Sequence, residues 1–317
     1  MNSAPPSVSL REAYGQTLVE LGATDPNVVV LDPEPPSESG TSTFGRQFPD
    51  RYFSVTESEP TLLAVAAELA TGQRCVFASA SARFAVGEAY NFLRHTIVHR
   101  RADVKLVTTD ASLATSGPER PPPFLEDIGI VRGLPGMTVI VPCDAPSTRA
   151  AVLALHERAG PAYLRLTTDD RPTLTDGSFR VGRAAELRSG SDLTIVAIGT
   201  MVASALEVAE DLARVGVSTR VLDFASVKPF DEPALLRAAR DTGAILVLEE
   251  HSALTGIGGL VAATTSENAS VPVRRVGIPD VFVEPGAPET QFERYGLGIP
   301  RIRDEAWELL RLRGKVQ

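Results

Sequence analysis

The sequence lacks the features that mark secreted, membrane-bound and nucleic-acid-binding proteins. Nowhere do about 18 apolar residues run together, as a membrane-spanning helix requires. Residues 1–10 have no basic region followed by an apolar run, so no signal peptide is expected. The 31 basic residues are outnumbered by 40 acidic ones, which gives a formal net charge of −9. A chain with a negative net charge is not attracted electrostatically to nucleic acid or to an anionic membrane.

Cysteine and histidine are scarce as well. The two cysteines, Cys75 and Cys143, lie in apolar segments, so we expect reduced core side chains and a cytoplasmic protein. His95 and His99 are four residues apart, but Thr96 follows His95 where a zincin motif needs Glu, and no third ligand is in view. We therefore expect no metal site in this chain.

The chain does have a regular alternation of apolar runs and helical patterns over its 317 residues, about twice the length of a typical domain. The candidate strands lie at 28–31, 52–55, 75–79, 104–108, 138–142, 162–166, 193–198, 219–222, 245–248 and 271–276. The candidate helices lie at 10–21, 62–69, 84–98, 147–156, 201–215, 232–239 and 258–263. Such alternation predicts an α/β protein with two domains of mostly parallel sheets flanked by helices.

Helix starts and a domain boundary are also marked in the sequence. Ser9 and Glu12 have the spacing of a capping box, and the Pro146-Ser147 pair opens a helix after Asp144. From residue 168 the sequence becomes polar and rich in turn residues. We place the first domain at 1–172, a linker at 173–191 and the second domain at 192–317.

Three segments outside these elements are candidates for a function. Glu59 stands just after a predicted strand, where an acid can simply favour a helix start, but ligand-binding groups also collect there in parallel sheets. Residues 110–124 form a loop long enough to be a binding site, an interface or a flap. The run at 256–259 (GIGG) lacks the spacing of a nucleotide loop and predicts a tight turn with close helix packing.

Seven blocks of the sequence, taken together, resemble a known family. They are LREAYGQTLVELGATDPNVVVLD at 10–32, FPDRYFSVTESEP at 48–60, VAAELATG at 65–72, FASASARFAVGEAYNFLR at 77–94, LEDIGIVRGLPGMTVIVPCD at 125–144, GPAYLRL at 160–166 and VLDFASVKPFDEPALLRAARDTGAILVLEEHS at 221–252. Their order resembles the C-terminal half of transketolase, with its pyrimidine-binding and C-terminal domains. The length is similar to that of the second subunit of split transketolases and, more distantly, to the β subunit of 2-oxo acid dehydrogenase E1.

The resemblance implies thiamine diphosphate as cofactor and assigns roles to three residues. Glu59 matches the family glutamate that hydrogen-bonds N1′ of the aminopyrimidine and so promotes removal of the C2 proton. Phe84 matches the aromatic residue that stacks on the pyrimidine. Glu34 occupies the place of a family aspartate near the thiazolium.

The family motif that holds the diphosphate is missing from this chain. Gly-Asp-Gly, which binds the diphosphate through Mg²⁺ on the family's N-terminal domain, occurs nowhere in the sequence. The resemblance therefore implies a partner subunit that carries this domain and the Mg²⁺, in an α2β2 heterotetramer with shared active sites.

The family's substrate-binding residues are replaced. The family's Thr-His becomes Thr109-Asp110, and the replacements elsewhere are Pro60, Ser81, Pro118, Pro122 and a residue near Thr168. These replacements remove hydrogen-bond donors and charges, so a sugar phosphate acceptor would lose its usual contacts. The sequence leaves open whether Ser81, Asp110 or Arg120 has taken over substrate contacts.

Three hypotheses follow. The first is a transketolase-like transferase that moves a two-carbon ketol or acyl unit to an atypical acceptor, bound to a carrier or lipoyl protein, in a specialised biosynthetic pathway. The second is an E1-type β subunit that serves 2-oxo acid decarboxylation. The third is a non-catalytic structural or regulatory subunit, against which the presence of Glu59 and Phe84 speaks.

Overall fold

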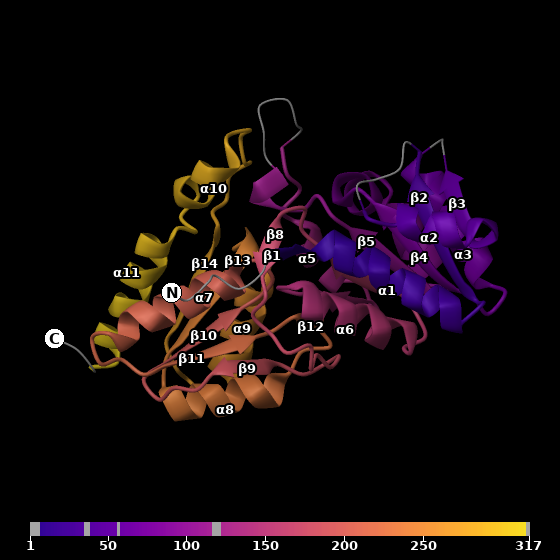
Figure 1. Cartoon of the computed structure of the whole chain (residues 1–317). Helices are drawn as coiled ribbons and strands as arrows, with labels where there is room; N and C mark the ends of the chain where they lie inside the picture. Colours follow the sequence, from indigo (N-terminus) through magenta and orange to yellow (C-terminus); the bar gives the residue numbers. More distant parts are fainter. Residues whose placement is uncertain (1–6, 35–38, 56–57, 116–121, 315–317) are drawn as a thin grey trace.

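The computed structural model describes residues 7–34, 39–55, 58–115 and 122–314, and its two large sheets confirm the predicted α/β fold (Figure 1). Both sheets consist mostly of parallel strands, and helices cover both faces of each. In Figure 1 strands β2 (Val28–Pro33) to β7 (Ala162–Arg165) of the first sheet lie in the indigo-to-magenta part of the chain, while β12 (Ser226–Lys228) of that sheet and the whole second sheet lie in the pink-to-orange part. Among the described residues, no helix is long and apolar enough to cross a lipid bilayer.

The first sheet has the strand order β12-β6-β7-β5-β4-β2-β3. Its strands are β2 (Val28–Pro33), β3 (Tyr52–Val55), β4 (Cys75–Ala80), β5 (Val104–Thr108), β6 (Thr138–Ile140), β7 (Ala162–Arg165) and β12 (Ser226–Lys228). All neighbours are parallel except β12, which runs antiparallel to β6.

Alternate residues of β2 face opposite helix layers, as the strand repeat of two requires. Val28 and Val30 pack in the cluster that includes helices α1 (Leu10–Thr24) and α6 (Ala145–His156), whereas Val29 and Leu31 pack in the cluster that includes α3 (Glu59–Ala70). The helical elements of this half are α1 (Leu10–Thr24), α2 (Ser42–Gln47), η1 (Pro49–Arg51), α3 (Glu59–Ala70), η2 (Arg83–Glu88), α4 (Tyr90–Phe92), η3 (Leu93–Val98), η4 (Leu113–Thr115), α5 (Asp127–Arg132) and α6 (Ala145–His156).

The helix predicted over 84–98 is present, but most of it is π-helical, since the π segments η2 and η3 lie on either side of α4. The amide of Ala89 donates to the carbonyl of Phe84 at 2.7 Å, and that of His99 donates to Arg94 at 2.9 Å, each five residues back. A spacing of apolar residues at three to four positions does not distinguish these wider turns from an α-helix. Helical turns of the π type are rare in proteins, and those that occur are often found at functional sites.

The second sheet has the strand order β14-β13-β10-β11-β9. Its elements are β9 (Ala185–Arg188), β10 (Leu193–Ala197), α7 (Met201–Ala213), β11 (Thr219–Asp223), α8 (Glu232–Thr242), β13 (Ile245–Ser252), α9 (Ile257–Asn268), β14 (Val273–Ile278), α10 (Pro288–Arg294) and α11 (Ile299–Leu312). Strand β9, within the segment placed as a linker, runs antiparallel to β11. Side chains of α7 and α11 cover one face of this sheet, and those of α8 and α9 cover the other.

A shared hydrophobic cluster and a shared strand are among the contacts that join the halves. One hydrophobic cluster includes residues of both large sheets, among them Val29 of β2 and Val196 of β10. Strand β12 follows β11 in the chain but pairs with β6 of the first sheet. The halves therefore share a hydrophobic core and the first sheet. Apart from the two large sheets, β1 (Ser7–Ser9) pairs with β8 (Asp170–Pro172) in a small sheet of its own.

One predicted helix cap is confirmed and the other is wrong. Asp144 accepts from the amide of Ser147 at 2.9 Å and forms a capping box at the start of α6. Ser9 makes no such bond, because it belongs to β1 and pairs with Asp170. Glu12 instead accepts a hydrogen bond from Gln16 one turn later.

Both cysteines are buried and free, as expected of core residues. Burial raises the pKa of Cys75 to about 12, and burial also raises the pKa of Cys143. A thiol that holds its proton so firmly is a poor nucleophile.

Gly256 allows the start of α9 to approach a buried acid, which confirms the predicted tight turn and close packing. The carboxylate of Glu249 accepts from the amides of Ile257 at 2.7 Å and Gly258 at 3.0 Å. Burial raises the pKa of Glu249 to about 7, and these two N–H groups oppose the rise. A Cβ on Gly256 would lie 1.8 Å from Oε2 of Glu249.

We therefore expect Gly256→Ala to lower the free energy of unfolding by about 2–4 kcal/mol, because the clash displaces a buried carboxylate from its donors. The control is Gly259→Ala in the same helix, where the nearest atom to the new Cβ lies 3.7 Å away. That change should be neutral or stabilising by up to about 1 kcal/mol. Urea denaturation measures both, and equal stabilities of the two variants would contradict the account.

Candidate functional site

The sheet order brings the residues singled out from the sequence to one edge of the first sheet. The chain passes from β2 to β3 on one side and then to β4 on the other, so the order reverses between β2 and β4. In open α/β sheets, ligands bind beyond the carboxyl ends of the strands at such a point. Glu34 follows β2, Glu59 follows β3, Phe84 follows β4 and Asp110 follows β5. The topology therefore predicts a ligand site here, independently of any resemblance.

Glu59 is the first residue of α3, with Pro60 beside it in the first turn as predicted. Its side chain is half-buried, and among the described residues its carboxylate has no hydrogen-bond or ion-pair partner. The preceding residues Thr56 and Glu57 lie outside the described residues. A partly buried acid without a partner at a helix start is available to a ligand.

Phe84 presents a large aromatic surface at the same edge. Its side chain is 38% exposed, while the following residues Ala85 and Val86 are fully buried. The backbone of η2 is thus held in the core and the ring is left outside. Exposed aromatic surface of this kind, next to polar groups, is typical of a ligand or partner contact.

Glu34 is exposed, and its backbone amide donates to the carbonyl of Val55 at 3.1 Å. This bond fixes the end of β2 against the end of β3, the strand that leads to Glu59. Among the described residues the Glu34 carboxylate has no partner. The structure therefore places all three candidate cofactor residues, Glu34, Glu59 and Phe84, on neighbouring strand ends.

A buried acid behind this edge was not found from the sequence. Asp32, the fifth residue of β2, accepts hydrogen bonds from Ser39 at 3.2 Å, Thr41 at 2.6 Å and Tyr52 at 3.3 Å. Burial raises the pKa of Tyr52, and the nearby Asp32 charge adds to the rise. An acid inside the apolar strand VVVLDP was the available signal. The cluster secures the segment after residue 38 to the strand end.

Asp110 anchors the loop to the segment that carries Phe84. Its carboxylate accepts from the hydroxyl of Ser81 at 2.5 Å and from the amide of Ala82 at 2.8 Å. Both oxygens are thus engaged within the chain. Ser81 and Asp110 therefore contact each other, and their roles toward a substrate stay a prediction. Arg120, the third, lies outside the described residues.

The other end of the loop returns to the same segment. Arg83 donates to the carbonyl of Pro122. A Cβ built on Gly87 of η2 would lie 3.4 Å from the ring of Phe124. Both ends of the loop 110–124 are therefore held against residues 81–87, so the position of the Phe84 backbone depends on the loop.

Glu250 of β13 holds the loop from the second sheet. Its carboxylate accepts from the hydroxyl of Ser112 at 2.9 Å, from the amide of Leu113 and from Thr200 at 2.9 Å. Burial raises the pKa of Glu250, and the charge of Arg165 opposes the rise. The carboxylate thus joins three segments that are far apart in the sequence.

Arg165 and His251 extend this buried network. The guanidinium of Arg165 donates twice to the carbonyl of Glu250, both at 3.0 Å, and its Nε lies 3.1 Å from Asp127. The Nε2 atom of His251 accepts from the amide of Gly129 at 3.1 Å, so the proton is on Nδ1, 3.0 Å from the carbonyl of Ser252. Burial lowers the pKa of His251 to about 4, which agrees with a neutral ring.

We expect Asp110→Ala to lower the free energy of unfolding by about 1–3 kcal/mol, since it leaves two donors without an acceptor. Asp110→Asn is the matched control, because its amide can accept from Ala82 and donate to the Ser81 hydroxyl. Urea denaturation and limited proteolysis of the loop measure the effect. If both variants lost the same stability, the hydrogen bonds described here would not be what holds the loop.

Comparisons with known proteins agree with this geometry. The family model for the transketolase pyrimidine binding domain matches residues 6–172, and that for the transketolase C-terminal domain matches residues 182–302. The chain is 36% identical to the 6-deoxy-6-sulfo-D-fructose transketolase subunit SqwH of Clostridium sp. (strain MSTE9), over 95% of this chain and 94% of that protein. It is 32% identical to one of the subunits of the apulose-4-phosphate transketolase of Phocaeicola vulgatus, over 96% of this chain and 98% of that protein.

A solved structure supports the same assignment. It is described as a split gene transketolase in an inactive beta4 tetramer, and it matches with a TM-score of 0.90 and 40% identity. The match covers 96% of this chain and 99% of that one. The resemblance stated from the sequence blocks is thus confirmed over nearly the whole length. This chain belongs to the transketolase family and is similar to the C-terminal subunits of its split members.

Proposed function

We propose that the chain is the second subunit of a split, thiamine diphosphate-dependent transketolase-like enzyme that transfers a two-carbon ketol or acyl unit. The observation that carries the proposal is the half-buried carboxylate of Glu59, which has no partner among the described residues and lies on the edge that also presents the Phe84 ring. A site of this kind suits a ligand with both an aromatic face and a polar edge. An aminopyrimidine has both.

The residues of this edge fit the pyrimidine end of thiamine diphosphate. Phe84 would stack on the ring, Glu59 would hydrogen-bond the ring nitrogen N1′, and Glu34 would lie toward the thiazolium. When bound, the cofactor supplies a nucleophilic carbon and an electron sink for cleavage of a carbon–carbon bond. The role of Glu59 is to exchange a proton with N1′, which a carboxyl group held in a partly desolvated position can do.

A partner subunit would hold the other end of the cofactor. The sequence has no Gly-Asp-Gly motif, so Mg²⁺ and the diphosphate would be bound by an N-terminal transketolase-like subunit in an α2β2 assembly. The solved relative, a tetramer of beta chains, is described as inactive. If the active site is shared between two kinds of subunit, an assembly of second subunits alone is expected to be inactive.

The acceptor is proposed to be atypical, bound to a carrier or lipoyl protein. Asp110 stands where the family has a histidine, and its two oxygens are engaged by Ser81 and Ala82. Pro122 replaces a second histidine and offers no side-chain donor. The relatives named above carry sugar substrates in their names, so a modified sugar is the alternative acceptor.

We expect Glu59→Gln in the reconstituted pair to reduce turnover by about 10²-fold or more, because the amide cannot exchange a proton with N1′. Cofactor binding should persist, since the proposed diphosphate site lies on the partner. The control is Glu68→Gln, an exposed acid of the same helix α3 that pairs with Arg100. Steady-state kinetics and calorimetry of thiamine diphosphate binding separate the two effects. Unchanged turnover of the Glu59 variant would remove the catalytic assignment.

We expect the reconstituted pair to transfer the two-carbon unit to a carrier- or lipoyl-bound acceptor in preference to simple aldose phosphates. The reason is the loss of side-chain donors at positions 110 and 122. Mass spectrometry of the products, with both acceptor classes offered together with a ketose phosphate or 2-oxo acid donor, measures the preference. Efficient transfer to unmodified aldose phosphates would contradict this part of the proposal.

A further inference from the structure

The segment 110–125 connects the two halves of the protein. Leu113 is fully buried and Leu125 is 3% exposed. Both pack in the hydrophobic cluster of the second sheet, which includes Met201 of α7. Asp110, in contrast, bonds to residues of the first half just before η2. The segment thus lies in the core of one half and is bonded to the candidate site of the other.

Glu250 of β13 gives this segment its polar contact with the second half. The carboxylate is 2% exposed, and both of its oxygens accept hydrogen bonds. Oε1 accepts from the hydroxyl of Ser112 at 2.9 Å and from the amide of Leu113. Oε2 accepts from the hydroxyl of Thr200, next to the start of α7, at 2.9 Å. Helix α10 packs against the same short helix η4 from another side. The segment is therefore held by polar and apolar contacts of the second half together.

The hold of the segment passes on to the start of η2. Asp110 accepts from the hydroxyl of Ser81 at 2.5 Å and from the amide of Ala82 at 2.8 Å. The carbonyl of Ser81 accepts from the amide of Ala85 at 2.9 Å, which closes the first turn around Phe84. A displacement of Asp110 therefore displaces the backbone that carries the exposed Phe84 ring.

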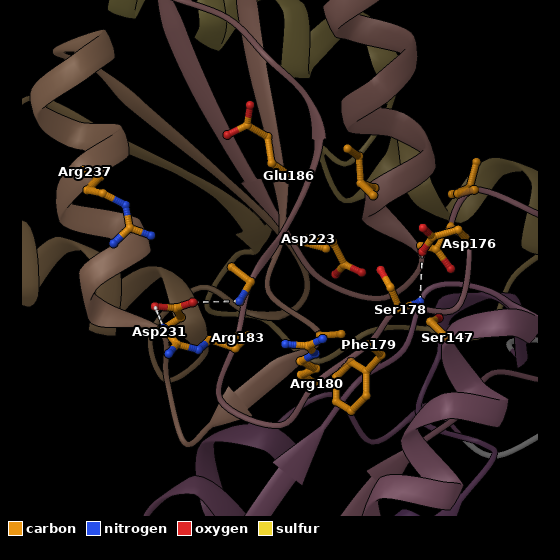
Figure 2. Close-up of a pocket in the computed structure, with 16 residues that line it drawn as sticks. Ser147, Asp176, Ser178, Phe179, Arg180, Arg183, Glu186, Asp223, Asp231 and Arg237 are labelled. Carbon is orange, nitrogen blue, oxygen red and sulfur yellow. Dashed lines mark hydrogen bonds and ion pairs between the residues drawn. The ribbon is translucent and has the colours of Figure 1, made fainter.

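The halves also meet around β11, but that contact does not include η2. There the segment 174–187, the end of β11 and helix α8 enclose a cavity of about 680 Å³ (Figure 2). Ser147 of α6 lines it from the first half, and Asp223 of β11 lines it from the second. Among the described residues, none that lines this cavity belongs to η2 or to the segment 110–125. Of these two contacts, the one at Glu250 is therefore the one that acts on Phe84.

We propose that Glu250 is a positioning residue, which couples the packing of the two halves to the affinity of the candidate site for the aminopyrimidine ring. This inference rests on the proposed function, in which Phe84 stacks on that ring. Glu250 does not touch the ligand, because it is buried and both of its oxygens are occupied by the chain. It acts through the segment 110–125, whose position sets the orientation of Phe84.

The first test needs no cofactor and uses hydrogen–deuterium exchange of the full chain. Glu250→Ala should speed exchange of the amides of 81–88 and 112–115 by about tenfold or more, because Ser112 and Leu113 lose their acceptor. Glu250→Gln should restore slow exchange. Its amide oxygen can accept from Ser112 and Leu113, and its NH₂ group can donate to Thr200.

The control for a general loss of stability is Thr242→Val. Thr242 is fully buried at the end of α8, where its hydroxyl lies 2.8 Å from that of Thr194. Its replacement removes a buried hydrogen bond of the second half away from the segment 110–125, so exchange of 81–88 should stay as in the wild type. Unchanged exchange in Glu250→Ala, or an equal rise in Thr242→Val, would overturn the proposal.

The second test is a thiamine diphosphate titration of the reconstituted pair. Glu250→Ala and Phe84→Ala should each raise the cofactor concentration for half-maximal activity by about tenfold, with kcat changed by less than about threefold. The double variant should need no more cofactor than Phe84→Ala alone, because Glu250 acts through Phe84. Glu250→Gln should titrate as the wild type does.

The outcomes separate this inference from the proposed function. A normal cofactor requirement in Phe84→Ala would contradict the role that the proposed function gives to Phe84, whatever the exchange data show. If both single variants raised the requirement and their effects multiplied in the double variant, the proposed function would stand. Glu250 would then act independently of Phe84, and the inference drawn here would be wrong.

Discussion

The buried carboxylate of Glu250 is the interaction on which the geometry of the candidate site depends. A charge in the core costs several kcal/mol unless donors surround it, and here Ser112, Leu113 and Thr200 supply them. These donors come from the loop of the first sheet and from the start of α7, so the carboxylate is satisfied only when the two halves are packed together. The loop in turn holds η2 through Asp110. The placement of Phe84 thus follows from an acid on a different sheet.

The carboxylates in the core and those at the sheet edge differ in whether the chain itself supplies their hydrogen-bond partners. The acids that set the position of the loop, Glu250 and Asp110, have their carboxylates occupied by donors of the chain itself, whereas Glu59 and Glu34 have no partner among the described residues. A rigid backbone with unsatisfied side chains at its rim is what a site shared between subunits requires, because the missing half of the contacts comes from another chain.

The sequence predicted the sheets well because their strands are short, continuous apolar runs. It also placed Glu59 at a helix start, since Pro60 and the preceding strand mark that position. It did not predict the anchoring role of Asp110 or the contact between Ser112 and Glu250, which are 138 residues apart. No local pattern encodes such a contact, although two adjacent acids at the end of the apolar run ILVLEEHS were a sign of buried charge. The π turns of 83–98 were missed because their bonding differs from that of an α-helix by one residue per turn.

Strand β12 has a consequence for how this protein can be divided. It belongs by sequence to the second half, yet it provides the outermost strand of the first sheet beside β6. A fragment that ended at residue 172 would keep all the candidate cofactor residues but would leave the β6 edge without its neighbour. Open edges of this kind invite pairing with other chains. A separated first domain of this chain would therefore need a substitute for β12 as well as the candidate cofactor residues.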